Sequence, residues 1–92
     1  MSDPFSAFEW DDNKRRANVE KHGIDFADAT EVFDDPNQRT YRSTTESGEE
    51  RYLSIGMFRG RLITVIFTRR GEKIRIISAR AARRNERERY DG

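Results

Sequence analysis

Hydrophobic positions follow two different periods along this chain. Near the N-terminus, apolar and small residues recur at helical spacing after Asp25, a natural N-cap, and a polar turn at residues 34–37 ends the segment. From Arg51 to Ala79, apolar and polar residues alternate instead, as in strands. The chain therefore predicts helices first and a sheet afterwards. The helical positions are Phe26, Ala29, Thr30 and Phe33, at i, i+3, i+4 and i+7.

An earlier helix is predicted from Asn13 to about Lys21. Asp11 or Asp12 can cap its first turn, because an aspartate carboxylate accepts hydrogen bonds from free backbone N–H groups there. Gly23 is a suitable stop, since glycine adopts the left-handed conformation that ends many helices.

The remaining pattern completes an α+β fold. Hairpin turns are predicted at residues 59–60 and 70–72, and a charged helix from Ala81 onward. We expect one domain over residues 1–92, with two N-terminal helices and a C-terminal helix around an antiparallel β-sheet. The predicted strands are Phe8–Trp10, Arg39–Ser43, Arg51–Phe58, Arg61–Arg69 and Lys73–Ala79.

Composition narrows the class of protein. Only 34% of the 92 residues are hydrophobic and 38% are charged, so the core must be small. The absence of cysteine excludes disulfides and thiolate zinc sites. No apolar run reaches the ~20 residues that span a bilayer, and the first residues do not resemble a signal peptide. A cytoplasmic protein without membrane contact is expected.

Charge is strongly polarised along the sequence. Residues 1–50 carry 6 Lys/Arg and 13 Asp/Glu, whereas residues 51–92 carry 12 Lys/Arg and 4 Asp/Glu. Arginine, whose planar fork suits phosphate contacts, supplies 15 of the 18 cations. This distribution favours a polyanionic partner such as RNA. Ordinary solvated surface charge is the alternative, but it explains neither the segregation nor the preference for arginine.

Several segments resemble a known family, the BrnT toxins. The opening residues Trp10-Asp11-x-x-Lys14, Asn18-x-x-Lys21-His22-Gly23 and Asp25-Phe26-x-x-Ala29 are similar to the start of that family. In the middle of the chain, the residues similar to the family are Gly48-Glu49-x-Arg51 and Gly56. Near the end of the chain, they are residues 74–80, Ala82 and Glu86-Arg87. The match covers roughly residues 8–90, and its specificity comes from the ordered set rather than from any single piece.

The resemblance implies properties that composition and periodicity do not show. It implies a RelE-like fold and an endoribonuclease that blocks translation. It also implies a cognate ribbon-helix-helix antitoxin (BrnA-like), in a 2:2 complex that binds operator DNA and represses its own operon. Two alternatives remain: a non-catalytic module that binds nucleic acid or antitoxin, and a degenerate toxin that retains only the antitoxin interface.

RNA cleavage without a metal uses the 2′-hydroxyl as nucleophile, so the enzyme needs proton transfer and charge stabilisation. Arg51, Arg75 and Arg80 are the candidate clamps for developing charge, with Arg80 the strongest since small residues precede it. For each, a cross-strand ion pair is the alternative, and simple alternation does not give a purely polar face. His22 and Glu49 are the candidate acid and base. Their alternatives are a helix-terminal cation and an ion pair.

The remaining candidate residues have structural or RNA-binding interpretations. Trp10 is expected in the core, and Asp34 and Asp35 are expected in a turn. No residues have metal-ligand spacing, and no cofactor is implied. The C-terminal helix is interpreted either as a solvated helix or as a grip for RNA or an acidic antitoxin segment. The RNA-binding candidates are Lys21, Arg69, Arg83, Arg87 and Tyr90.

Overall fold

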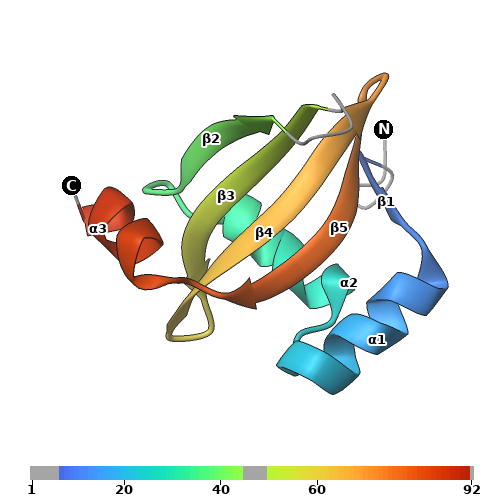
Figure 1. The fold of residues 1–92 in the computed structure, drawn as a ribbon, viewed down its shortest axis with the longest axis horizontal. Coiled ribbons are helices and arrows are strands. Elements are labelled where there is room, and N and C mark those ends of the chain that lie inside the picture. Colours follow the sequence, from blue (N-terminus) through green and yellow to red (C-terminus); the bar gives the residue numbers. More distant parts are fainter. Residues whose placement is uncertain (1–6, 45–49, 92) are drawn as a thin grey trace.

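The computed structural model describes residues 7–44 and 50–91, and these form helices packed on a sheet (Figure 1). The predicted α+β class is confirmed, with two N-terminal helices, a C-terminal helix and a mostly antiparallel sheet. The elements in order are β1 (Phe8–Trp10), α1 (Asp12–His22), α2 (Phe26–Ala29), the 3₁₀ helix η2 (Thr30–Asp34), β2 (Arg39–Thr44), β3 (Glu50–Phe58), β4 (Arg61–Arg70), β5 (Lys73–Ala81) and α3 (Arg84–Asp91).

The sheet has five strands in the order β1-β5-β4-β3-β2. Strands β2 to β5 form an antiparallel meander, and β1 adds to β5 in parallel, with Trp10 level with Ile76. Because β1 is so short, it covers only the first part of the β5 edge. The remainder of that edge is left for α1.

Local capping explains where the first helices begin and end. Asp11 accepts hydrogen bonds from the backbone N–H groups of Asn13 and Lys14, and Gly23 adopts a φ of 71° at the end of α1. Asp25 caps α2 through the N–H of Ala27. The second helix differs from a regular α-helix, because it tightens into the 3₁₀ helix η2 from Thr30 onward.

The main core lies between one sheet face and the α2–η2 segment. Phe26, Ala29 and Val32 pack there against Val65 and other strand residues. Gly56 permits close approach of η2 to β3, since a Cβ at this position would meet a Val32 Cγ at 2.8 Å. Trp10 packs against the same core, as expected from the sequence.

Among the described helices, only α3 lies on the opposite sheet face, here called the open face, where it covers one end (Figure 1). Ile55 and Leu62 on the strands pack with Ala82 and the half-buried Tyr41 and Tyr90, forming a second small cluster. The rest of this face is not covered by a described helix. Among the described residues, no helix combines the length and apolar character needed to cross a membrane.

Candidate functional site

A bulge at Ile77 decides which β5 side chains share the open face. Phe67 pairs with Ile76 and Ile66 pairs with Ser78, so Ile77 has no partner residue in the register. Strict alternation would place residues 75 and 80 on opposite faces of the sheet. The extra residue instead puts Arg75 level with Thr68 and Arg80 level with Thr64, so both arginines lie on the open face.

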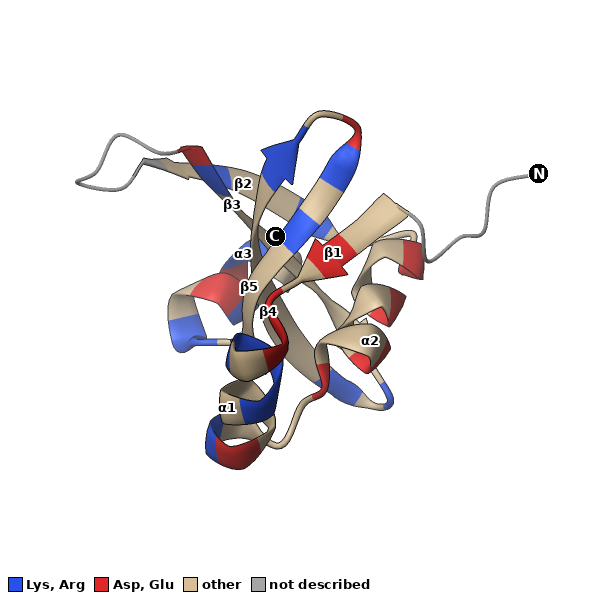
Figure 2. Ribbon diagram, turned by 90° about the vertical axis from the view of Figure 1, so that its right-hand side faces the viewer, with Lys and Arg blue, Asp and Glu red and all other residues tan. Residues whose placement is uncertain are grey.

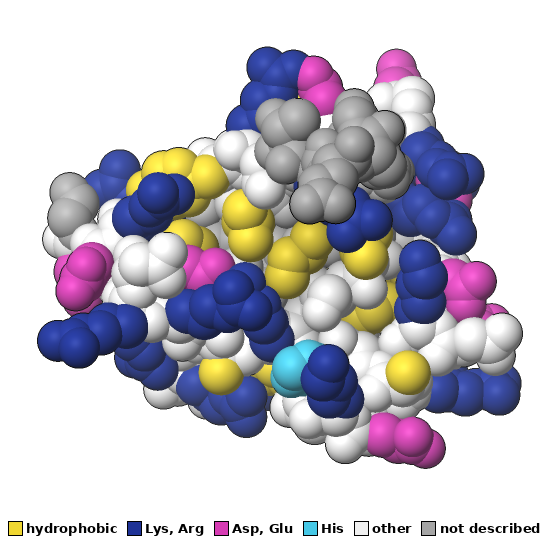
Figure 3. All heavy atoms as spheres, viewed as in Figure 1, with side chains coloured by type: hydrophobic (Ala, Val, Ile, Leu, Met, Phe, Trp, Pro, Cys, Tyr) yellow, Lys and Arg dark blue, Asp and Glu magenta, His cyan; other side chains and the backbone are white. Residues whose placement is uncertain are grey.

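The open face has an apolar floor with cations on both sides. Arg51 and Arg75 lie on one side of this floor and Arg80 on the other, as the strand registers require. Figure 3 shows this face, where hydrophobic side chains form a central patch with Lys and Arg side chains around it. Such a surface suits a polyanion that carries planar bases. The floor row runs through Tyr41, Leu53, Ile66 and Ser78.

Arg75 and Arg80 each have a carboxylate partner in the structure. The Arg75 guanidinium donates to Glu9 of β1 at 3.0 Å. Arg80 makes two hydrogen bonds to Glu86 of α3, at 2.7 and 2.9 Å, and both side chains are largely buried. In this bidentate geometry, the guanidinium N–H groups of Arg80 that could bind a phosphate are already bonded to Glu86. Arg80 therefore lies where it fastens α3 to the sheet.

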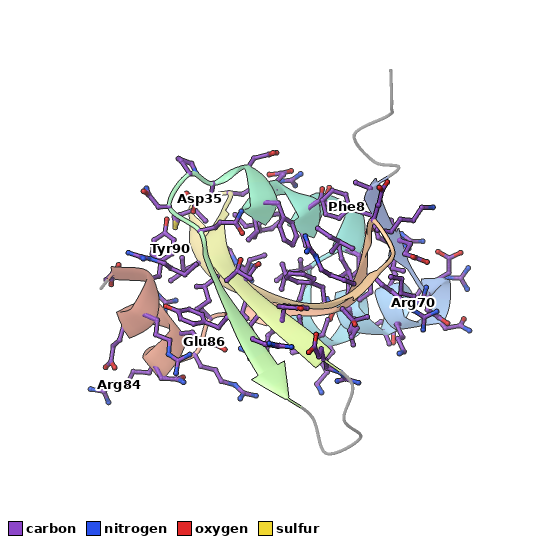
Figure 4. All side chains as sticks on the ribbon, turned by 90° about the horizontal axis from the view of Figure 1, so that it is seen from above. Phe8, Asp35, Arg70, Arg84, Glu86 and Tyr90 are labelled. Carbon is purple, nitrogen blue, oxygen red and sulfur yellow. The ribbon has the colours of Figure 1, made fainter. Side chains whose placement is uncertain are left out.

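The Glu86 carboxylate is the centre of this α3 anchor, which comprises Arg80, Glu86, Thr64 and the backbone of Arg83. Glu86 also accepts from the Thr64 hydroxyl at 3.0 Å and from the Arg83 N–H at 2.7 Å. Burial alone would raise the pKa of Glu86, but these hydrogen bonds and the Arg80 charge outweigh burial and lower the pKa to about 2. Figure 4 shows Glu86 directed from α3 toward the strands.

Tyr90 is held at the other end of α3. Its hydroxyl donates to Asp35 at 2.7 Å, and the same carboxylate accepts from the Met57 N–H at 2.8 Å (Figure 4). The Met57, Tyr90 and Asn37 hydrogen bonds lower the pKa of Asp35, and the bond to Asp35 raises the pKa of Tyr90. The turn role expected for Asp35 is confirmed, since it accepts from the Asn37 N–H. The Tyr90 hydroxyl is thus occupied in fastening α3.

A hollow of about 210 Å³ lies between α1 and β5, here called the α1–β5 hollow. Positions 14, 17, 18 and 21 are spaced i, i+3, i+4 and i+7, so they form one face of α1, with Ala17 leaving room at its centre. His22 completes the helix side, and Ser78 connects the hollow to the floor row of the open face. The lining residues are Lys14, Ala17, Asn18, Lys21, His22, Ile77 and Ser78.

Asn18 fixes α1 to the β5 edge beyond the end of β1. Its side-chain amide donates to the Ala79 carbonyl at 2.9 Å and accepts from the Ala79 N–H at 3.1 Å, as a neighbouring strand would. It also donates to the Ile24 carbonyl at 2.8 Å and accepts from the Ser78 hydroxyl at 3.3 Å. Asn18 thereby sets the position of the hollow, although it was not among the predicted site residues.

The cations of the α1–β5 hollow differ from the paired arginines. Within the described ranges, no carboxylate lies within 4.0 Å of the side-chain nitrogens of Lys14, Lys21 or His22. Figure 3 shows the histidine beside a cation at the edge of the open face. Lys14 and Ser78 were missed from the sequence, although the i, i+7 spacing of Lys14 and Lys21 could have indicated a shared face.

The structure separates other predicted residues from this hollow. Arg69 lies on the helix-covered side of β4, where it lines another hollow with Phe33, Tyr52 and Phe67. Arg83 and Arg87 are exposed on α3 or directly before it. Glu49 lies outside the described residues. No group of three or more His, Asp or Glu side chains within the described part of the chain could hold a metal ion.

A small α+β domain with a basic, apolar-floored sheet face and an adjoining hollow of lysines and histidine has the features of a nucleic-acid-binding protein. Residues 10–86 match the family described as the ribonuclease toxin, BrnT, of type II toxin–antitoxin systems. The chain belongs to this BrnT family, so the resemblance found in the sequence is confirmed. No curated protein sequence is similar enough to count as a match.

Proposed function

We propose that this ribonuclease toxin cleaves RNA without a metal ion, with the scissile phosphate in the α1–β5 hollow. The observation that carries the proposal is that Lys14, Lys21 and His22 line one hollow with no described carboxylate within 4.0 Å. A phosphate bound there meets cationic side chains that do not have to break ion pairs first. The hollow opens at Ser78 onto the floor row, where neighbouring bases can lie.

The proposed reaction is attack of the RNA's own 2′-oxygen on the adjacent phosphorus. His22 accepts the 2′-hydroxyl proton, since a neutral imidazole carries a ring nitrogen with a free lone pair. Lys14 and Lys21 stabilise the charge that develops on the phosphoryl oxygens. The bond from phosphorus to the 5′-oxygen breaks, and water entering the open hollow gives this oxygen a proton. The products are a 2′,3′-cyclic phosphate and a 5′-hydroxyl end.

The open face supplies binding rather than proton transfer. Leu53 and Ile66 offer an apolar surface to bases, and Arg51 lies beside them at the level of Ser43. Base stacking on such surfaces tolerates different sequences. Cleavage of cellular RNA then blocks translation. Arg80 is proposed to act indirectly, by holding α3 at the end of this face through Glu86.

A protein antitoxin is proposed to neutralise the toxin. Its proposed type is a ribbon-helix-helix protein (BrnA-like) in a 2:2 complex that binds operator DNA in the cytoplasm. The support is the family membership together with a basic surface, which favours an acidic or amphipathic partner segment.

End-group analysis tests the cleavage mechanism directly. Purified toxin is incubated with a 5′-labelled RNA in EDTA, and with added Mg²⁺ in a parallel reaction. The expected result is equal cleavage in both, with cyclic phosphate or 3′-phosphate ends. Activity that disappears in EDTA and returns with Mg²⁺ contradicts the proposal, as do 5′-phosphate products.

A further inference from the structure

The β3–β4 hairpin and α3 enclose a second depression, here called the hairpin–α3 groove, of about 370 Å³. It is separate from the α1–β5 hollow and shares no lining residue with it. Gly60, which has no side chain, lies at this groove. The lining residues are Met57, Gly60, Arg61, Leu62, Arg87, Tyr90 and Asp91.

The floor of the groove is apolar and partly exposed. Met57 pairs with Leu62 in the strand register, and Met57 is 42% exposed, one of two large hydrophobic residues so exposed in the described part of the chain. An exposed methionine adapts its shape to apolar partners. Tyr90 forms one wall of the groove, and the hydrogen bond from its hydroxyl to Asp35 holds it in place. This side of the groove is therefore formed before any partner binds.

The charge of the groove comes from two arginines that have no carboxylate partner in the described part of the chain. Arg61 and Arg87 are exposed, and no described carboxylate lies within 4.0 Å of either guanidinium. Nearby Arg59, in contrast, pairs with Asp28 at 3.2 Å and Glu31 at 2.9 Å. The groove therefore combines an apolar floor with two available cations.

From this combination we infer that the hairpin–α3 groove binds an acidic, amphipathic segment of the protein antitoxin. One apolar side chain of the segment packs on Met57 and Leu62, and carboxylates pair with Arg61 and Arg87. RNA fits less well, because every nucleotide carries a phosphate and Asp91 also lines the groove. A peptide segment, in contrast, can have a neutral or basic residue beside Asp91. This inference rests on the antitoxin part of the proposed function.

The test measures binding of the protein encoded by the reading frame adjacent to this gene. Calorimetry compares the wild-type toxin with the double variant Arg61→Glu/Arg87→Glu. Charge reversal at two contacts is expected to weaken antitoxin binding by about 100-fold or more. Met57→Ser is expected to weaken binding by about tenfold.

A matched control reverses the same number of charges elsewhere. Arg70 and Lys73 form an exposed register pair at the far end of β4 and β5. Arg70→Glu/Lys73→Glu is expected to bind the antitoxin within about threefold of wild type. If charge reversal unfolds the groove variant, Arg61→Gln/Arg87→Gln replaces it, with an expected weakening of about tenfold.

The outcomes separate this inference from the proposed function. Unchanged antitoxin binding by a folded groove variant overturns the inference alone. Lost cleavage with intact antitoxin binding also overturns it, because the groove then serves RNA. Failure of wild-type toxin to bind the adjacent protein overturns both the antitoxin proposal and this inference.

Discussion

Two residue clusters at β5 contain cationic side chains, and the surroundings of these cations differ. At the α3 anchor, Arg80 makes a bidentate, largely buried pair with Glu86, which also bonds to Thr64. In the α1–β5 hollow, Lys14, Lys21 and His22 have no described carboxylate within 4.0 Å. The first cluster therefore contributes to stability and the second is available to a ligand.

This difference shows that a cationic side chain contributes to stability where a carboxylate pairs with it, and is available to a ligand where none does. Apart from Glu50 on β3, the described acidic residues of the first half of the sequence lie on or beside β1, α1, α2 and η2 (Figure 2). They pair with some arginines from the basic half, such as Arg75 and Arg59. Mutations that separate loss of catalysis from loss of stability therefore distinguish the two clusters.

The largest effect is expected from removing the lysines of the hollow. Lys14→Ala/Lys21→Ala should lower the single-turnover cleavage rate by about a thousand-fold, because the charge on the phosphoryl oxygens loses its stabilisation. Both lysines are exposed, so thermal melting should change little. Arg16→Ala is the control, an exposed cation of α1 outside the hollow, and should retain the rate within about threefold. Equal effects of the two changes would contradict the assignment.

Arg80→Ala should act on stability. It leaves the Glu86 carboxylate without its charged partner in a buried position, and is expected to cost about 3 kcal/mol of unfolding free energy. Glu86→Gln keeps the shape and should cost about 2 kcal/mol. Urea unfolding measures both. If Arg80→Ala abolishes cleavage while remaining as stable as wild type, Arg80 contacts the RNA instead.

Acid should weaken the same anchor. The folded-state pKa of Glu86 is lowered to about 2 from the ordinary 4.5. A lowered pKa means that the stabilisation is complete above pH 4.5 and is lost as the pH falls toward 2. Urea unfolding between pH 6 and pH 3 should therefore show a smaller decline for Glu86→Gln than for wild type. Parallel declines would exclude Glu86 as the titrating group.

The smallest effect is expected at the far end of α3. Tyr90→Phe removes the hydrogen bond to Asp35 but keeps the ring in the cluster with Leu62. The expected loss is about 1 kcal/mol, with cleavage unchanged. A large fall in RNA cleavage by the folded variant would contradict the assignment of the Tyr90 hydroxyl to holding α3.

Much of the fold was predictable because its signals are local. Asp11, Gly23 and Asp25 mark helix ends through contacts within a few residues, and strand alternation identified the meander. The bulge at Ile77 was not predictable, since its effect depends on the register with β4. It explains why simple alternation gave no polar face, and why Arg75 and Arg80 nevertheless share one.

The candidate site was harder to predict because it depends on distant contacts. Asn18 bonds to Ala79, 61 positions away, and that contact places α1 beside Ser78. Glu86 lies only six residues after Arg80, yet a strand end and a helix start separate them. Periodicity within one element cannot show such a pair. Lys14 is a different case, because its spacing from Lys21 within α1 could have indicated the shared face.

The single-turnover rate of His22→Ala tests the central claim, that the α1–β5 hollow is the catalytic centre. The rate is measured from pH 5 to 9 on one RNA, beside wild type and Glu86→Gln at a temperature where all three are folded. The expected result is a fall of about 100-fold or more for His22→Ala, with a pH profile that differs from wild type, while Glu86→Gln keeps the wild-type rate. A folded His22→Ala protein with the wild-type rate and pH profile would contradict the account.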